Sequence, residues 1–186
     1  MQIKVICDNR IYNDKLDICW GLSCLIDEVL LFDTGESEKV LLGNMQKLNV
    51  SVENISTVVI SHDHYDHTGG LWGLLRENPR IRVYGLSKFS SLFKERVKNF
   101  GAELIEENKF TQIMPHIYLT GEMPTYYGNN PLSEESLIIG AKPGLIIITG
   151  CSHPGIIKII EKVKKNLPEP VSVSYTHLRA HETSLH

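Results

Sequence analysis

The chain has 186 residues, of which 42% are hydrophobic and 22% charged, so it can bury one substantial core and one domain is expected. A net charge of −3 supplies no basic field for a nucleic-acid backbone, and no stretch approaches the roughly 18–20 apolar residues of a membrane span. Neither a nucleic acid nor a membrane is therefore expected as a partner. The four cysteines form no CxxC pair, which predicts free thiols in a cytoplasmic protein.

The first half of the chain alternates apolar strands with helical patterns. A hairpin is expected to turn at Asp27–Glu28, and Ser87 is expected to cap a helix whose apolar face includes Leu92. In chain order, strands are predicted at 3–7, 22–26, 29–32, 57–61 and 81–84, with helices at 36–48, 69–77 and 88–100.

The second half is predicted to repeat this order on a smaller scale. The Gly/Pro/Asn-rich stretch 121–131 is expected to be a loop that marks the internal boundary. Strands are predicted at 103–106, 110–113, 117–120, 136–139 and 145–148, followed by an amphipathic helix at 155–167. Each half therefore has a strand pair, a short turn with a histidine, and a helix.

The stretch His62-Asp63-His64-Tyr65-Asp66-His67 carries the chemistry. It lies between a β-branched strand and a Gly pair, so a strand-to-helix loop is expected. His62 and His64 can converge on one ion there, while Asp66 and His67 turn toward a second. Imidazole and carboxylate in one cluster are typical of catalytic divalent sites, in preference to the alternative of a polar surface loop.

A further histidine, His153, follows the apolar strand 145–149 in the sequence Gly150-Cys151-Ser152-His153. With His62 and His64 it would complete a three-nitrogen site that leaves one position open for a water, whose pKa a bound ion lowers. The alternative is a buried histidine bonded within a turn. Cys151 could touch metal, although a small buried thiol is the commoner case.

Asp33, in Leu31-Phe32-Asp33-Thr34-Gly35, has two possible interpretations. The segment matches the Asp-Thr-Gly of aspartic proteases, but those need two such carboxylates, and this chain has one copy. The favoured prediction is that Asp33 accepts an imidazole N–H and fixes the tautomer of a ligand. Asp33 and Asp66 are the candidate catalytic carboxylates, and Tyr126 and Tyr127 are possible pocket walls.

Three motifs together resemble the metallo-β-lactamase superfamily: LFDTG, SHDHYDHTGG and TGCSHPGI. The resemblance covers residues 1–173 and implies an α/β fold, a four-layer αββα sandwich with metals at the sheet edges and an incomplete second half. TGCSHPGI, with residues 20–23 and 119–124, is similar to the branch named for 7,8-dihydropterin-6-methyl-4-(β-D-ribofuranosyl)aminobenzene-5′-phosphate synthase. His64, in place of the Glu of flavodiiron oxygen reductases, favours hydrolytic or transfer chemistry.

The resemblance implies a metal-dependent hydrolase that uses a metal-activated hydroxide on a small-molecule ester or phosphoester. A pterin-dependent transferase is the alternative. A third hypothesis is an inactive truncated fragment, because the GGFH-like and HCTG-like stretches of the branch are not found. Two divalent ions are expected, zinc first, with Mg, Mn or Fe as alternatives. Residues 174–186 resemble translated adaptor read-through and predict a non-native or disordered tail. The oligomeric state stays open.

Overall fold

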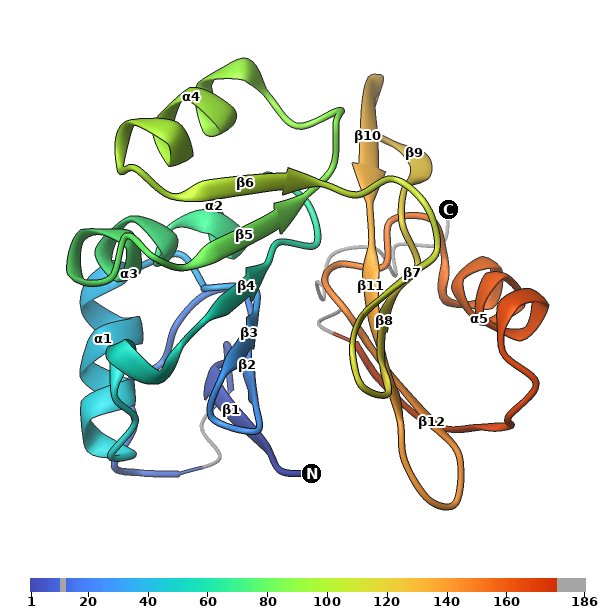
Figure 1. The fold of residues 1–186 in the computed structure, drawn as a ribbon, viewed down its shortest axis with the longest axis horizontal. Helices are drawn as coiled ribbons and strands as arrows, with labels where there is room; N and C mark the ends of the chain where they lie inside the picture. The colour runs from blue at the N-terminus through green and yellow to red at the C-terminus, as the bar shows by residue number, and fades with distance from the viewer. Residues whose placement is uncertain (11–12, 177–186) are drawn as a thin grey trace, which may run out of the picture.

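The computed structural model describes residues 1–10 and 13–176, in which two β-sheets face each other (Figure 1). The elements of the first half are β1 (Ile3–Cys7), β2 (Ser23–Ile26), β3 (Leu30–Phe32), α1 (Glu38–Lys47), the 3-10 helix η1 (Val52–Asn54), β4 (Thr57–Val59), α2 (Tyr65–Thr68), α3 (Leu71–Glu77), β5 (Arg82–Gly85), α4 (Ser91–Asn99) and β6 (Glu103–Glu106). Those of the second half are β7 (Thr111–Met114), β8 (Ile117–Leu119), β9 (Met123–Tyr127), β10 (Asn130–Glu134), β11 (Ser136–Gly140), β12 (Leu145–Thr149), α5 (Ile156–Asn166) and β13 (Val171–Thr176).

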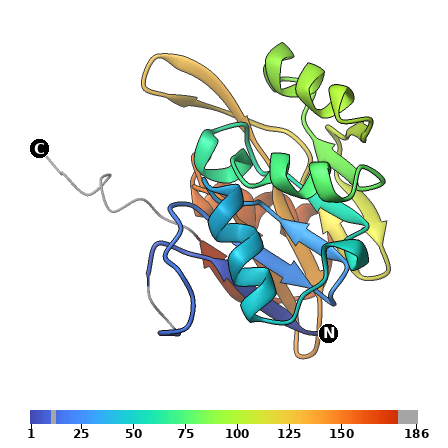
Figure 2. The ribbon, with the colours of Figure 1, turned by 90° about the vertical axis from the view of Figure 1, so that its left-hand side faces the viewer.

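The first sheet has the strand order β1-β2-β3-β4-β5-β6. Its β1, β2 and β3 are antiparallel, whereas β3 to β6 run parallel and are joined by crossovers that contain the helices. The second sheet has the order β13-β12-β11-β8-β7, and β9 with β10 forms a separate hairpin that projects past it (Figure 2). Because all parallel strands end at one edge, the loops that follow them collect there.

Strand β3 explains why both faces of the first sheet are buried. Its side chains alternate, so Leu31 joins the core beneath the helices, while Leu30 and Phe32 join the core between the two sheets. Helices α1, α3 and α4 cover the outer face of the first sheet, and α5 covers that of the second through Ile159 and Val163 (Figure 1). The predicted αββα sandwich is confirmed.

The predicted loop at 121–131 is wrong, because this stretch contains the β9–β10 hairpin. Its register pairs Met123 with Glu134 and Asn130 with Tyr127. Gly128, at φ 58°, and Asn129 form the two-residue turn, which is a hairpin signal that the flanking prolines obscured. Proline is tolerated here because the hairpin is not part of either large sheet.

Two details of helix α4 also differ from the prediction. The cap is Ser90, whose hydroxyl accepts a hydrogen bond from the Phe93 N–H at 3.3 Å, and Ser87 precedes it in the connecting loop. Leu92 is 73% exposed and does not share the buried face of Phe93 and Val97. The buried face of α4 therefore contains fewer residues than the sequence pattern predicted.

The end of the described chain forms an ordered strand. Strand β13 runs parallel to β12, pairs Tyr175 with Ile148, and ends at Thr176, the last residue that the structure describes. The predicted domain end at residue 173 therefore falls inside β13, and the remainder of the predicted tail, 177–186, lies outside the described residues. Within the described ranges, no helix combines the length and apolar character needed to cross a membrane.

Candidate metal centre

The candidate site lies where the strands of both sheets end. Strands β3 and β4 pair Phe32 with Val59, so the segments that follow them leave the first sheet side by side. The second sheet meets this edge closely, because the Ser61 carbonyl accepts a hydrogen bond from the Glu135 N–H at 2.9 Å. The loop after β4 and the turn after β12 are thereby brought together, although they are far apart in the sequence.

Three histidines converge at this edge. The ring centroids of His62 and His64 are 4.6 Å apart, and His153 lies 5.1 Å from His62 and 5.5 Å from His64. One ring nitrogen from each lies within 4.8 Å of the others, which is close enough for one ion to contact all three. The three-nitrogen set expected from the sequence is the set that the fold assembles, and imidazole nitrogens suit a divalent transition metal.

Asp66 and His67 lie on the short helix α2, and both are fully buried. The Nε2 atom of His67 is 3.6 Å from the Asp66 Oδ2 atom and 3.3 Å from the Cys151 sulfur. His67 and Cys151, with His62, form a second group whose donor atoms lie within 4.8 Å of one another. Burial raises the pKa of the Cys151 thiol, and its hydrogen bond with His67 opposes that rise.

Asp33 supports the Asp66–His67 side of the site through its contacts with Ser61 and His67. Its carboxylate accepts hydrogen bonds from the Ser61 N–H at 2.7 Å and the Ser61 hydroxyl at 2.8 Å, and it lies 2.7 Å from Nδ1 of His67. Asp33 adopts φ 58°, a left-handed conformation that aspartate tolerates better than most residues. The contact is the imidazole–carboxylate pair expected from the sequence, and it leaves Nε2 of His67 facing the cluster.

The charge of Asp33 also sets the protonation of His67. Burial of the ring opposes a positive charge, but the charge of Asp33 and its hydrogen bond outweigh burial and hold the pKa of His67 well above its usual value. The metal-free ring is thus favoured in its doubly protonated form, with the Nδ1 proton facing Asp33, and the Nε2 proton would have to leave before that nitrogen could bind a metal ion.

Glu134 is a buried carboxylate beside the site that the sequence did not indicate. Its two carboxylate oxygens accept hydrogen bonds from the Ser152 N–H at 2.9 Å and the His153 N–H at 2.7 Å, which fixes the turn that carries His153. Burial of the carboxylate raises the pKa of Glu134 to about 7. The only sequence signal is the pair Glu134–Glu135 directly before a buried strand, where a carboxylate needs partners.

A cavity of about 340 Å³ lies beside the histidines, between the start of α4 and the β9–β10 hairpin. Asp63, from the His62–His67 loop, lines it, as does Thr125, whose hydroxyl donates to the His153 carbonyl at 3.0 Å. Lys88 and Tyr126 are also among its lining residues. The predicted pocket wall at Tyr126 is therefore observed.

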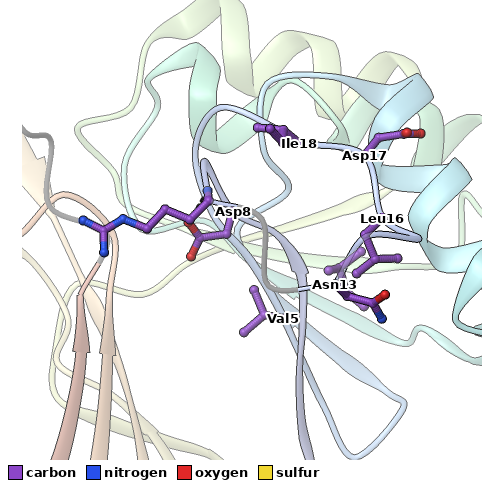
Figure 3. Close-up of a pocket in the computed structure, with 8 residues that line it drawn as sticks. Val5, Asp8, Asn13, Leu16, Asp17 and Ile18 are labelled. Atoms are coloured by element: carbon purple, nitrogen blue, oxygen red, sulfur yellow. Dashed lines mark hydrogen bonds between the residues drawn. The ribbon is translucent and has the colours of Figure 1, made fainter.

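The ring of Tyr127 lies against the histidine cluster itself, with centroids 5.1 Å from His64 and 5.4 Å from His153. A smaller recess of about 50 Å³ borders β1 and the segment 13–18, and it is lined by residues that include Val5, Asp8 and Ile18 (Figure 3). Two other cavities are lined by residues of the His62–His67 loop: the 340 Å³ cavity by Asp63, and a more open one of about 590 Å³ by Asp63 and Tyr65.

Two facing sheets with helices outside them, and a histidine cluster at their common edge, define the metallo-β-lactamase class of protein. The sequence pattern of the family described as the metallo-beta-lactamase superfamily matches residues 23–156. The chain belongs to this superfamily. Since its described residues contain clusters that could hold a metal ion, the site agrees with the family assignment.

Several known proteins are similar to this chain. The chain is 28% identical, over 81% of its length and 67% of the relative's, to the 7,8-dihydropterin-6-methyl-4-(beta-D-ribofuranosyl)-aminobenzene-5′-phosphate synthase of Methanocaldococcus jannaschii. An uncharacterized protein of the same organism is 30% identical over 88% of this chain and 74% of that protein. The crystal structure of Tm1679, a metal-dependent hydrolase of the beta-lactamase superfamily, aligns with 98% of this chain and 78% of its own at 26% identity and a TM-score of 0.77.

Proposed function

We propose that this protein is a metal-dependent hydrolase of a small-molecule phosphoester or ester. The observation that carries the proposal is the convergence of one ring nitrogen each from His62, His64 and His153 within 4.8 Å of one another. A cavity of about 340 Å³ is lined by Asp63 of the same loop. The likeness to Tm1679, a protein named as a metal-dependent hydrolase, supports the same reaction type.

The donor set fits a divalent ion, because three imidazole nitrogens lie within reach of one centre and His67, Asp66 and Cys151 lie beside them. Such an ion, when bound, supplies a Lewis acid and an activated water. We expect zinc first, and two ions in all, with Mg, Mn or Fe as alternatives.

The chain's own residues have distinct tasks in this proposal. Asp33 keeps the Nδ1 proton of His67 in place, so that Nε2 is the nitrogen that faces the ligand cluster. Asp66 supplies a buried carboxylate to the same cluster. Lys88 lines the cavity and offers a positive charge to a substrate group, beside the carboxylates of Asp63 and Glu122 on the same lining.

A second candidate is a transferase that acts on a pterin, and one specific observation favours it. The Methanocaldococcus jannaschii relative, similar over 81% of this chain, is named as a synthase of a pterin-linked aminobenzene phosphate. In this alternative, the same ion would assist displacement of pyrophosphate, and Tyr126 and Tyr127 would offer aromatic surface to a heterocycle.

The test uses the full chain loaded with zinc and assayed against p-nitrophenyl phosphate, bis-p-nitrophenyl phosphate, p-nitrophenyl acetate and a simple lactone. Hydrolysis of a phosphoester that is lost in His64→Asn supports the hydrolase. The matched control is His116→Asn, because His116 is an exposed histidine at φ 62°, a conformation that asparagine accepts.

The two candidates are separated by a second assay with a dihydropterin pyrophosphate, with and without an aminobenzene ribotide. Pyrophosphate release that requires both substrates would replace the hydrolase proposal with the transferase. Metal binding without turnover of any of these compounds would overturn both and favour an inactive fragment. We also propose a cytoplasmic location, supported by the free thiols Cys7, Cys19, Cys24 and Cys151.

A further inference from the structure

Two buried thiols, those of Cys7 and Cys19, lie beside each other outside the histidine cluster. Cys7 ends strand β1, and Cys19 lies shortly before β2. A Cβ atom on Gly35 would lie 2.5 Å from the Cys19 sulfur and 3.3 Å from the Cys7 sulfur, so both sulfurs border the same point. The backbone also brings the two segments together, because the Cys19 N–H donates to the Asp8 carbonyl at 3.2 Å.

The Cys19 sulfur lies where a thiolate is stabilised. The backbone N–H groups of Glu36 and Ser37, at the start of α1, face it. A hydrogen bond from the Cys7 thiol is the largest influence on Cys19, and with these N–H groups it outweighs burial and lowers the pKa of Cys19 to about 7. Because thiolates and not thiols attack oxidants, Cys19 is the nucleophile of the pair.

Cys7 has the opposite character. Its hydrogen bond with Cys19 and its burial raise the pKa of Cys7 far above the usual value, so its proton stays in place. A protonated thiol next to a thiolate is the arrangement of a reactive cysteine with its resolving partner. Cys24, a third cysteine in this region, is fully buried, and burial raises its pKa as well. Cys24 therefore does not compete with Cys19 as a nucleophile.

The recess of about 50 Å³ lies next to the pair (Figure 3). Ile6 and Asp8, on either side of Cys7, are among its lining residues. Ile18, which directly precedes Cys19, lines it as well. A volume of this size holds roughly one or two water molecules, which is also the size of hydrogen peroxide. A small oxidant can therefore come close to the pair, whereas a bulky one does not fit the recess.

We propose that Cys7 and Cys19 are a redox-active pair, which hydrogen peroxide converts into a disulfide. The Cys19 thiolate attacks one peroxide oxygen, the O–O bond breaks, and a sulfenic acid forms on Cys19 while hydroxide leaves and takes up the proton that Cys19 had released. The Cys7 sulfur then attacks the Cys19 sulfur, the S–O bond breaks, and the leaving hydroxide takes the Cys7 proton. Two thiols lose two electrons, one peroxide is reduced, and two waters form.

The pair lies one short connection from the candidate metal centre. A Cβ atom on Gly21, two residues after Cys19, would lie 1.7 Å from the Asp66 carbonyl oxygen, so the two backbones are in direct contact. The Glu36 N–H also donates to the Trp20 carbonyl at 3.0 Å. The disulfide would thus form in a segment that packs against the centre without including its candidate ligands. The proposal does not depend on the metal-dependent activity proposed above.

The first test maps the disulfide in the full chain. The reduced, metal-free chain is treated with hydrogen peroxide, quenched with acid, unfolded, alkylated with N-ethylmaleimide and digested with trypsin. Cleavage separates residues 5–10, which contain Cys7, from residues 16–39, which contain Cys19 and Cys24. The expected result is one disulfide between these peptides, which fragment ions assign to Cys19. A pair that stays reduced, or a link from Cys7 to Cys24, overturns the proposal.

The second test separates the roles of the two thiols. In Cys7→Ser, the sulfenic acid on Cys19 has no partner, and we expect dimedone to capture it. In Cys19→Ser, Cys7 keeps its proton, and we expect it to react with peroxide at least roughly tenfold more slowly. Equal rates of sulfenic acid formation in the two variants would overturn the assignment of Cys19 as the nucleophile.

The matched control is Cys24→Ala, in which the link between Cys7 and Cys19 is expected to form at the wild-type rate. Its loss in a variant that circular dichroism shows to be folded would overturn the proposal. If this variant does not fold, the fragment ions of the first test still decide between Cys19 and Cys24. Glutathione disulfide, a bulky oxidant, is expected to form the link at least roughly tenfold more slowly than peroxide, and an equal rate would contradict the choice of a small oxidant.

Discussion

The two halves of the molecule contribute to the metal centre by different means. The first half supplies four side chains from one loop and helix, and Asp33 supports them by contacting a ligand side chain, His67, as well as the backbone. The second half supplies His153 from one turn, and Glu134 supports that turn through backbone N–H groups alone. One buried carboxylate serves each half, but only the first touches an imidazole.

This difference teaches how each half should respond to change. A carboxylate that fixes an imidazole controls both the tautomer and the direction of a ligand nitrogen. A carboxylate that binds only N–H groups controls where a turn lies and does not contact the side chain that the turn carries. Substitution of Asp33 should therefore weaken metal binding strongly, whereas substitution of Glu134 should weaken it by less.

The largest effect is expected for Asp33→Asn. The amide keeps the shape of the side chain, but the Ser61 N–H and Nδ1 of His67 bond to different carboxylate oxygens, so the NH2 group of asparagine would face one of these two donors. Because this breaks a fully buried ion pair, we expect the free energy of unfolding to fall by about 3 kcal/mol and zinc affinity to fall roughly 10–100-fold. Urea unfolding and competition with a chelator measure the two quantities.

The control for this substitution is Asp63→Asn in the same loop. The Asp63 carboxylate accepts a hydrogen bond from the Ser90 N–H at 2.7 Å, whereas that of Asp33 is bonded to His67. We expect its zinc affinity to change less than that of Asp33→Asn. Equal losses in the two variants would contradict the special role given to the first-half carboxylate.

The next effect concerns pH and Glu134. Since the folded pKa of about 7 lies above the usual 4.5, the metal-free fold is most stable below pH 4.5 as far as this group is concerned, and it loses stability as pH rises through 7. The loss amounts to roughly 3 kcal/mol at most. Glu134→Gln, which cannot ionise, should flatten this dependence in urea unfolding between pH 5 and 8.

Glu161→Gln provides the comparison for that experiment, because Glu161 is an exposed glutamate on α5. It should retain the wild-type slope. If Glu134→Gln also kept the full slope, the titration would belong to another group, and the second half would not be held by a carboxylate of raised pKa.

A smaller effect is expected where the two halves touch. A Cβ atom on Gly150 would lie 2.3 Å from the Ser61 hydroxyl oxygen and 3.2 Å from Glu134 Oε1. The hydroxyl is bonded to Asp33 and cannot move away freely. Gly150→Ala should therefore separate the halves, cost about 1–3 kcal/mol of stability and weaken zinc binding.

The matched substitution is Gly43→Ala in helix α1, where an added Cβ would meet no atom within 4 Å. Alanine there should stabilise the helix by about 0.5–1 kcal/mol. Unchanged zinc affinity in Gly150→Ala would mean that the halves do not need this contact to form the centre.

Much of the site could be predicted because its ligands follow apolar strands, and a strand's end fixes where the next residues lie. His62 and His153 were located in this way. The supporting role of Glu134 could not be predicted, because its partners are backbone N–H groups 18 and 19 residues away, and such groups have no sequence signature. The contact between Cys151 and His67 depends on how the two sheets pack, which periodicity within either half does not specify.

The smallest effect tests whether the β9–β10 hairpin belongs to the second-half support. The Thr125 hydroxyl donates to the His153 carbonyl at 3.0 Å, and Thr125→Val removes this hydrogen bond while keeping the side-chain shape. We expect a loss of about 1 kcal/mol in stability and a correspondingly small loss of zinc affinity, because Glu134 still holds the turn. Thr111→Val, whose hydroxyl donates to the Lys109 carbonyl away from the site, is the control for zinc binding. A loss of affinity in Thr125→Val as large as that in Asp33→Asn would show that the hairpin, not Glu134, positions His153.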